Sequence, residues 1–213
     1  MVITWYGEAC FKIQSGDVTL KTDPFDKASA GLTTPYFNAN VTLLSHATLP
    51  DFETYDDAGR NNTSLISSPG EYEMKGMVVR GIQINMGGEG IDTAYVISWG
   101  DLKLIHLGFL NTAKINSRLM EACADADIMF VPIGKPYLDA GDAATIVNQL
   151  SPKIAIPMCY AVKGLSRKAE DASAFLKELS VSPEQQDKLT IKKKDITEEE
   201  HTEIILLNAQ ASA

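Results

Sequence analysis

The feature that most constrains the fold is a change in the pattern of apolar and polar residues near the middle of the chain. Up to residue 108, short alternating or apolar runs bounded by Gly, Pro and Asn are typical of β-strands. These runs cover residues 2–7, 10–16, 17–25, 40–46, 63–68, 72–85, 92–101 and 102–108. The segment "WGD" between the last two runs indicates a hairpin turn. The first half therefore predicts a sheet with many antiparallel pairs.

The second half alternates between strand-like and helix-like segments. Continuous apolar runs at 126–134 and 152–160 predict buried strands, whereas 113–124, 139–150 and 168–179 have apolar residues at helical spacing. Ile115, Leu119, Met120 and Cys123 form the apolar face of the first predicted helix. Short strands at 188–193 and 203–208 end the pattern. The sequence thus predicts an α/β (α+β) fold of two sheets packed face to face, with helices outside.

Length, charge and cysteine content narrow the class of protein. A chain of 213 residues fits one domain spanning residues 1–213. A net charge of -9 argues against nucleic acid and anionic membranes as partners, and no apolar stretch is long enough to span a bilayer. The three cysteines contain no CxxC pair, and "MVITWYG" leads directly into strand-like alternation. These features favour reduced thiols and a cytoplasmic location.

Several segments, taken in order, carry a resemblance to a known family. They are "ITWYGEACFKI", "LKTDPF", "TLLSH", "SPGEYEMKG", "LIHLG", "ADIMFVPIG" and "SPKIAIPMCY", between residues 3 and 160. Together they resemble the metallo-β-lactamase superfamily, in its small bacterial branch of zinc-dependent hydrolases related to a lactonase group. The resemblance implies a four-layer αββα sandwich of two mixed β-sheets flanked by helices. It also implies a metal site on loops at one edge of the sheets.

The metal ligands of that family are mostly absent here. Active members hold two metals through histidine and aspartate side chains, and the two metals share a hydroxide nucleophile. Only His46 matches a family ligand. The replaced positions are Thr48 and Asp51 for histidines, Pro50 for an aspartate, Asn85 or Met86 for a later histidine, Phe109 for the bridging aspartate and Cys159 for the last histidine. Because a phenyl ring has no donor atom, Phe109 argues against a dinuclear zinc centre.

A reduced mononuclear site remains an alternative. His46, Asp51 and Cys159 can all bind zinc, and a thiolate suits that metal. The competing interpretation is that His46 ends a strand, Asp51 begins a turn and Cys159 is a small buried hydrophobic residue. Two further alternatives are a Cys159–His46 nucleophile pair, which has no evident third residue to orient it, and an acid/base pair of Glu71 and Glu73, which has no supporting nucleophile.

The remaining candidates have both functional and structural interpretations. The resemblance implies that Glu8 lies beside the metal cleft, while a loop carboxylate is the plain alternative. It also implies that Asp23 supports the metal loop; without metal, we expect Asp23 to cap its turn. We expect His106 to be a core histidine rather than a ligand.

Three functional hypotheses follow from these residues. The first is a catalytically degenerate member of the family that acts by binding or assembly, with no cofactor and with a small-molecule ligand in a vestigial cleft at His46, Asp51, Cys159, Phe109, Glu8 and Asp23. The second is a hydrolase of a small ester, lactone or phosphoester that uses one zinc ion. The third is a homo-oligomer with a mainly structural role. Fold alone does not decide between them.

Overall fold

The smaller of the two main sheets contains the N-terminal strands. The computed structural model describes residues 1–47, 63–84, 90–196 and 201–211. β1 (Val2–Gly7), β2 (Cys10–Ser15) and β3 (Val18–Thr22) form an antiparallel meander. β4 (Val41–Leu43) and β6 (Ser64–Ile66) add parallel strands beyond β3, and β14 (Leu189–Thr190) pairs with β1 at the other edge. The sheet is therefore mixed, with order β14-β1-β2-β3-β4-β6.

The larger sheet has the order β15-β12-β11-β10-β9-β8-β7. From one edge, its strands are β7 (Gly70–Met74), β8 (Met77–Gln83), β9 (Ile91–Trp99), β10 (Leu102–His106), β11 (Ile128–Pro132), β12 (Ile154–Met158) and β15 (Glu203–Ile204). The pairs from β7 to β10 are antiparallel and those from β10 to β15 are parallel. The short β5 (His46–Ala47) pairs with β9, and β13 (Gln185–Gln186) pairs with β16 (Leu206–Leu207).

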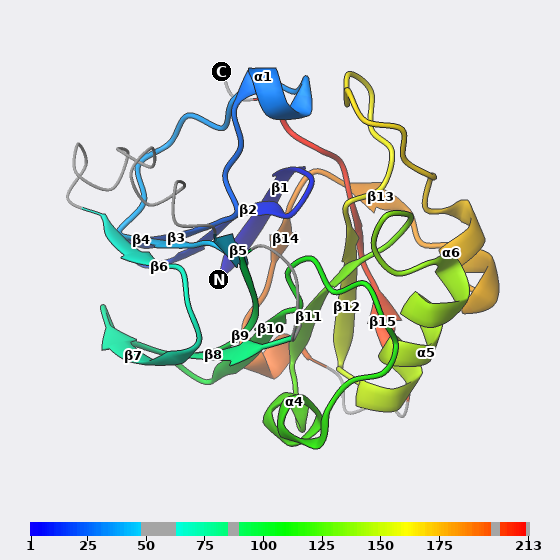
Figure 1. Ribbon diagram of the computed structural model, residues 1–213. Coiled ribbons are helices and arrows are strands. Elements are labelled where there is room, and N and C mark those ends of the chain that lie inside the picture. The colour runs from blue at the N-terminus through cyan, green and yellow to red at the C-terminus, as the bar shows by residue number, and fades with distance from the viewer. Residues whose placement is uncertain (48–62, 85–89, 197–200, 212–213) are drawn as a thin grey trace.

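Helices flank the larger sheet. Figure 1 shows α4 (Ser117–Cys123), α5 (Ala140–Leu150) and α6 (Ser173–Glu178) near β10, β11 and β12. α1 (Lys27–Ala30) follows the end of β3, and a 3-10 helix covers Lys193–Asp195. The predicted fold class, with two mixed sheets and outer helices, is confirmed. Within the described residues, no helix has the length and apolarity needed to cross a membrane.

The core lies between the two sheets. The Phe11 ring on β2 lies 4.4 Å from the Phe130 ring on β11 and 6.2 Å from the imidazole of His106 on β10, measured between centroids. Every residue of β11 and β12 is buried, because one face of these strands meets the smaller sheet and the other meets helices. This double burial explains why both strands are continuous apolar runs in the sequence.

Three local predictions needed correction. The run at 72–85 is not one strand but part of a hairpin, because Lys75 and Gly76 turn the chain with φ of 52° and 74° between β7 and β8. The predicted helix at 168–179 is helical only in α6, since the carbonyl of Glu170 accepts a hydrogen bond from the Ala161 N–H instead of from a helical turn. Met120 in α4 is 41% exposed and does not belong to the buried face.

Candidate functional site

The candidate residues lie just beyond the ends of strands that run in the same direction within each sheet. Glu8 follows β1, Asp23 follows β3, and His46 follows β4; in the other sheet Phe109 follows β10. These four side chains line one pocket of about 440 Å³. Other residues of the same pocket are Pro24, Phe25, Ser29, Ala30, Leu44 and Tyr137. We call this pocket the cleft. Cys159 follows β12 and is fully buried, and Asp51 lies outside the described residues.

Asp23 connects two loops of the cleft. Its Oδ1 accepts a hydrogen bond of 2.5 Å from the backbone N–H of Ser45, immediately before His46. Its Oδ2 lies 3.8 Å from Nδ1 of His106 and has no hydrogen-bond partner among the described residues. Burial raises the pKa of Asp23 to about 7, although the hydrogen bonds from Ser45 act in the opposite direction. Asp23 thus connects the loop after β3 to the Ser45–His46 segment through a backbone hydrogen bond.

His106 is enclosed between the sheets. It has no solvent exposure, and its Nε2 lies 3.2 Å from the carbonyl oxygen of Ala9. The backbone N–H of Gly108 donates to its Nδ1 at 3.2 Å, which assigns the neutral tautomer with the proton on Nε2. Burial lowers the pKa of His106 to about 4 because the imidazolium cannot be solvated there. His106 therefore has the environment of a satisfied core histidine.

His46 is the exposed member of the candidate set. The pairing of β5 with β9 aligns His46 with Asp92, and Nδ1 lies 2.5 Å from Oδ1 of Asp92. In the neutral imidazole, Nδ1 donates this hydrogen bond and Nε2 is the nitrogen that accepts. His46 and Asp92 also line a neighbouring pocket of about 340 Å³, together with Phe109 and Tyr137. Asp92 was not among the residues predicted from the sequence.

An ion pair joins Glu8 to a residue from a distant loop. Nε and Nη2 of Arg167 donate to the two carboxylate oxygens of Glu8, each at 2.7 Å. Nη2 also donates to the carbonyl oxygen of Cys159 at 2.5 Å, and the guanidinium carbon lies 5.3 Å from the ring centroid of Tyr137. Arg167 thus connects the β1–β2 turn to the loop after β12 and lies against an aromatic face. No local sequence pattern singles out Arg167.

Cys159 lies beneath the cleft in a strained backbone conformation. Its φ is 65°, in the left-handed region, and its N–H donates to the carbonyl of Glu8 at 3.2 Å. Burial, together with the charge of Glu8, raises the pKa of the Cys159 thiol well above its usual value. Arg167 acts in the opposite direction but does not offset the burial. The thiolate, which is the form that binds zinc, is therefore disfavoured in this environment.

Phe109 packs against another ring in the cleft. Its centroid lies 5.3 Å from that of Tyr137, with an angle of 30° between the ring planes. Phe109 is partly buried and contacts the main core. The space next to His46 is consequently bordered by two aromatic rings.

A comparison with protein families now identifies the fold. The model of the Beta-lactamase superfamily domain matches residues 2–159, which is most of the chain. The chain belongs to the metallo-β-lactamase superfamily. The family assignment made from the seven sequence segments is thereby confirmed, and the molecule is a hydrolase-like protein of the metallo-β-lactamase fold.

Individual members of the superfamily are similar over nearly the whole chain. The UPF0173 protein PYRAB01190 of Pyrococcus abyssi is 26% identical over 202 residues, covering 84% of this chain and 90% of its own. A candidate zinc-dependent hydrolase of the superfamily from Thermotoga maritima is 25% identical, with a TM-score of 0.76 and 97% of both chains covered. The metallo-β-lactamase fold protein YhfI from Bacillus subtilis, at 10% identity and a TM-score of 0.62, covers 97% of this chain and 95% of its own.

At the positions where the resemblance implies metal ligands, the described residues do not fit the family's dinuclear centre. At the bridging position, Phe109 has no donor atom and its ring contacts Tyr137. At the last histidine position, Cys159 is buried as a thiol beside a guanidinium. Among residues 1–47, 63–84, 90–196 and 201–211, no group of three or more His, Cys, Asp or Glu side chains is arranged to hold a metal ion. The replacements at Thr48, Pro50, Asp51, Asn85 and Met86 lie outside the described residues.

Proposed function

We propose that this metallo-β-lactamase-fold protein binds a small molecule in the cleft and does not carry out metal-dependent hydrolysis. The contact of Phe109 with Tyr137 is the observation that carries the proposal. A bridging ligand must supply an oxygen with two lone-pair directions, and here an aromatic pair fills that side of the cleft. A ring pair of this kind favours a ligand with a flat or apolar body.

The charges around the cleft support the same proposal. Arg167 forms a bidentate pair with Glu8 and donates to the carbonyl of Cys159. A fixed guanidinium at this place repels a divalent cation, and it engages both oxygens of the Glu8 carboxylate. The pair therefore replaces metal–ligand bonds as the connection between these loops.

The polar groups of the cleft indicate what part of a ligand they would recognise. The Nε2 of His46 is the acceptor nitrogen in the neutral tautomer, because Nδ1 then donates to Asp92. A ligand with a hydroxyl, amide or amine donor attached to its apolar body is therefore favoured. With a net charge of -9, the protein has no general attraction for nucleic acid or anionic membranes.

A metal-binding experiment tests the proposal. The wild-type protein, purified without chelator, is analysed for zinc and manganese and is then titrated with each metal while its unfolding temperature is recorded. His46→Gln and Cys159→Ser remove the candidate ligands, and His201→Gln removes an exposed histidine outside the cleft as a matched control. We expect the wild type and all three variants to contain less than one metal ion per chain. Added zinc or manganese should not raise the unfolding temperature of the wild type more than that of the variants.

The opposite pattern would refute the proposal. It would consist of one zinc per wild-type chain that is retained in His201→Gln but lost in both His46→Gln and Cys159→Ser. That result would support the zinc-dependent hydrolase with ligands at His46, Asp51 and Cys159. Assays with simple ester, lactone and phosphoester substrates would then measure whether the bound metal is active.

A further inference from the structure

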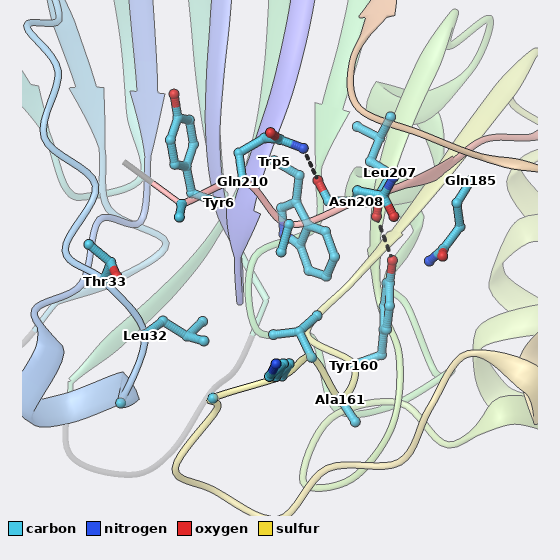
Figure 2. A pocket seen from close by; sticks show the side chains of 16 residues that line it. Trp5, Tyr6, Leu32, Thr33, Tyr160, Ala161, Gln185, Leu207, Asn208 and Gln210 are labelled. Atoms are coloured by element: carbon cyan, nitrogen blue, oxygen red, sulfur yellow. Dashed lines mark hydrogen bonds between the residues drawn. The ribbon is translucent and has the colours of Figure 1, made fainter. Parts of the chain in front are cut away.

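A second pocket lies on the other side of the loops that border the cleft. It has a volume of about 430 Å³, and Figure 2 shows Leu32 and Thr33 on one side, Tyr160 and Gln185 on the other, and Trp5 between them. We call it the rear pocket. The complete lining consists of residues 5–6, 31–33, 160–164, 185 and 207–211. None of these residues is in the lining of the cleft. This volume is in the range of sites for small organic ligands.

The charge of the rear pocket is unusual for this protein. The chain as a whole has a net charge of -9, yet none of the residues lining this pocket is Asp or Glu, and one of them is Lys163. Lys163 is exposed and forms no ion pair or hydrogen bond within the part of the chain that the structure describes. Such a pocket is a local positive region on an acidic molecule, and it favours an anion.

The remaining groups of the rear pocket provide an apolar surface and fixed amides. Leu32, Val162 and Ala209 give the lining its accessible apolar surface. Leu207 has no solvent exposure, and its carbonyl oxygen holds the Tyr160 hydroxyl at 2.9 Å. Behind the lining, Asp187 accepts hydrogen bonds from Asn208 Nδ2 at 3.0 Å and Gln210 Nε2 at 3.4 Å (Figure 2 labels both amide residues). The Asp187 carboxylate is thus bonded to amides of two lining residues and does not itself line the pocket.

The walls of the rear pocket are held by backbone contacts rather than by side chains alone. The N–H of Ser166 donates to the carbonyl of Ala30 at 2.8 Å, and the N–H of Gln210 donates to the carbonyl of Trp5 at 2.8 Å. Gly31 has a φ of 76°, and a Cβ at this position would lie 2.7 Å from the carbonyl oxygen of Gly164. Four chain segments are therefore joined in pairs around the pocket, as a preformed binding site requires.

From these observations we propose that the rear pocket binds a small organic anion, with Lys163 contacting the charged group and the surface of Leu32, Val162 and Ala209 contacting an apolar body. This site is separate from the cleft and does not depend on the function proposed for it. An aromatic carboxylate combines both required features, so benzoate is a suitable probe and benzamide is its neutral isostere.

The test measures benzoate binding to the full chain by NMR titration of backbone amides. We expect shifts at residues 161–164 and 207–211 and little change at residues 44–46 and 107–109 of the cleft. Lys163→Gln should weaken binding about fivefold, since one exposed ion pair contributes a modest amount. Lys168→Gln, an exposed lysine on the same loop that does not line the pocket, should leave affinity unchanged. Benzamide should bind about fivefold more weakly than benzoate.

A steric variant separates binding in the pocket from attraction to surface charge. Ala161 is exposed and lines the pocket, so Ala161→Phe should block benzoate while retaining Lys163. The proposal is overturned if benzoate shifts no pocket signals, if the shifts fall in the cleft, or if Lys163→Gln and Lys168→Gln bind equally well. It is equally overturned if Ala161→Phe binds like wild type.

Discussion

Replacement of Arg167 by alanine should destabilise the protein by an amount that the contacts of its side chain define. The change removes two hydrogen bonds of 2.7 Å to the Glu8 carboxylate and one bond to the carbonyl of Cys159. Glu8 has 14% side-chain exposure, so its carboxylate would remain largely desolvated without a partner. Removal of one partner from a fully buried pair costs roughly 3–5 kcal/mol. Arg167 is itself 24% exposed, so we expect a loss of about 2–3 kcal/mol.

Urea and thermal unfolding measure this loss. In a domain of this size, about 2–3 kcal/mol corresponds to a fall in Tm of roughly 5–10 °C. Lys168→Ala, next to Arg167 but exposed, is the matched control and should change stability by less than about 0.5 kcal/mol. In a double-mutant cycle, Arg167→Ala combined with Glu8→Gln should cost about 1–2 kcal/mol less than the sum of the single changes. A strictly additive cycle, or a loss near that of the control, would refute the proposed role of the ion pair.

Three other predictions concern titration, backbone conformation and thiol reactivity. Burial raises the pKa of Asp23 to about 7 and lowers that of His106 to about 4. Between about pH 4 and about pH 6.5, Asp23 holds a proton in the native state that it releases in the unfolded chain, so its contribution to stability falls as the pH rises. Over the same range His106 lacks a proton in the native state that it binds in the unfolded chain, so its contribution to stability rises with pH. Asp23→Asn should therefore gain stability with rising pH more steeply than wild type in urea titrations across this range, and parallel curves would contradict this assignment. Gly31→Ala should lose more stability than Gly16→Ala, because both glycines have positive φ but only Gly31 faces a backbone oxygen at 2.7 Å; equal losses in thermal unfolding would show that this close contact has no effect. Because burial raises the pKa of the Cys159 thiol, iodoacetamide should modify it only after unfolding, and mass spectrometry of the native protein would reveal any earlier reaction.

The strands could be predicted where local pattern and tertiary burial agree. The apolar runs at 126–134 and 152–160 contain β11 and β12, as predicted. Both strands are covered on two faces, so their residues are apolar throughout and do not alternate with polar ones. The prediction of a helix over 168–179 was wrong for its first residues, because the apolar spacing is helical but these residues bond to another loop. Glu170 accepts its hydrogen bond from Ala161, a contact that no local pattern encodes.

The candidate site could be predicted only in part for a related reason. Glu8, Asp23, His46 and Phe109 were singled out through the resemblance to the metallo-β-lactamase superfamily, and the structure brings all four to one pocket. Their most important partners come from unrelated parts of the chain. Arg167 is 159 residues from Glu8 and Asp92 is 46 residues from His46. Such pairs depend on strand register and loop path, which are set by packing of the whole domain.

The ring at Phe109 also bears on how such a chain can evolve. Phe109→Asp would put a carboxylate against Tyr137 with no metal to compensate its charge, and would remove an aromatic contact with the core. Cys159→His would insert a larger side chain at a fully buried position with φ of 65°. Each change alone should lower stability, and neither supplies a complete set of metal ligands. Single substitutions that each preserve stability would therefore not build a metal centre around this aromatic contact.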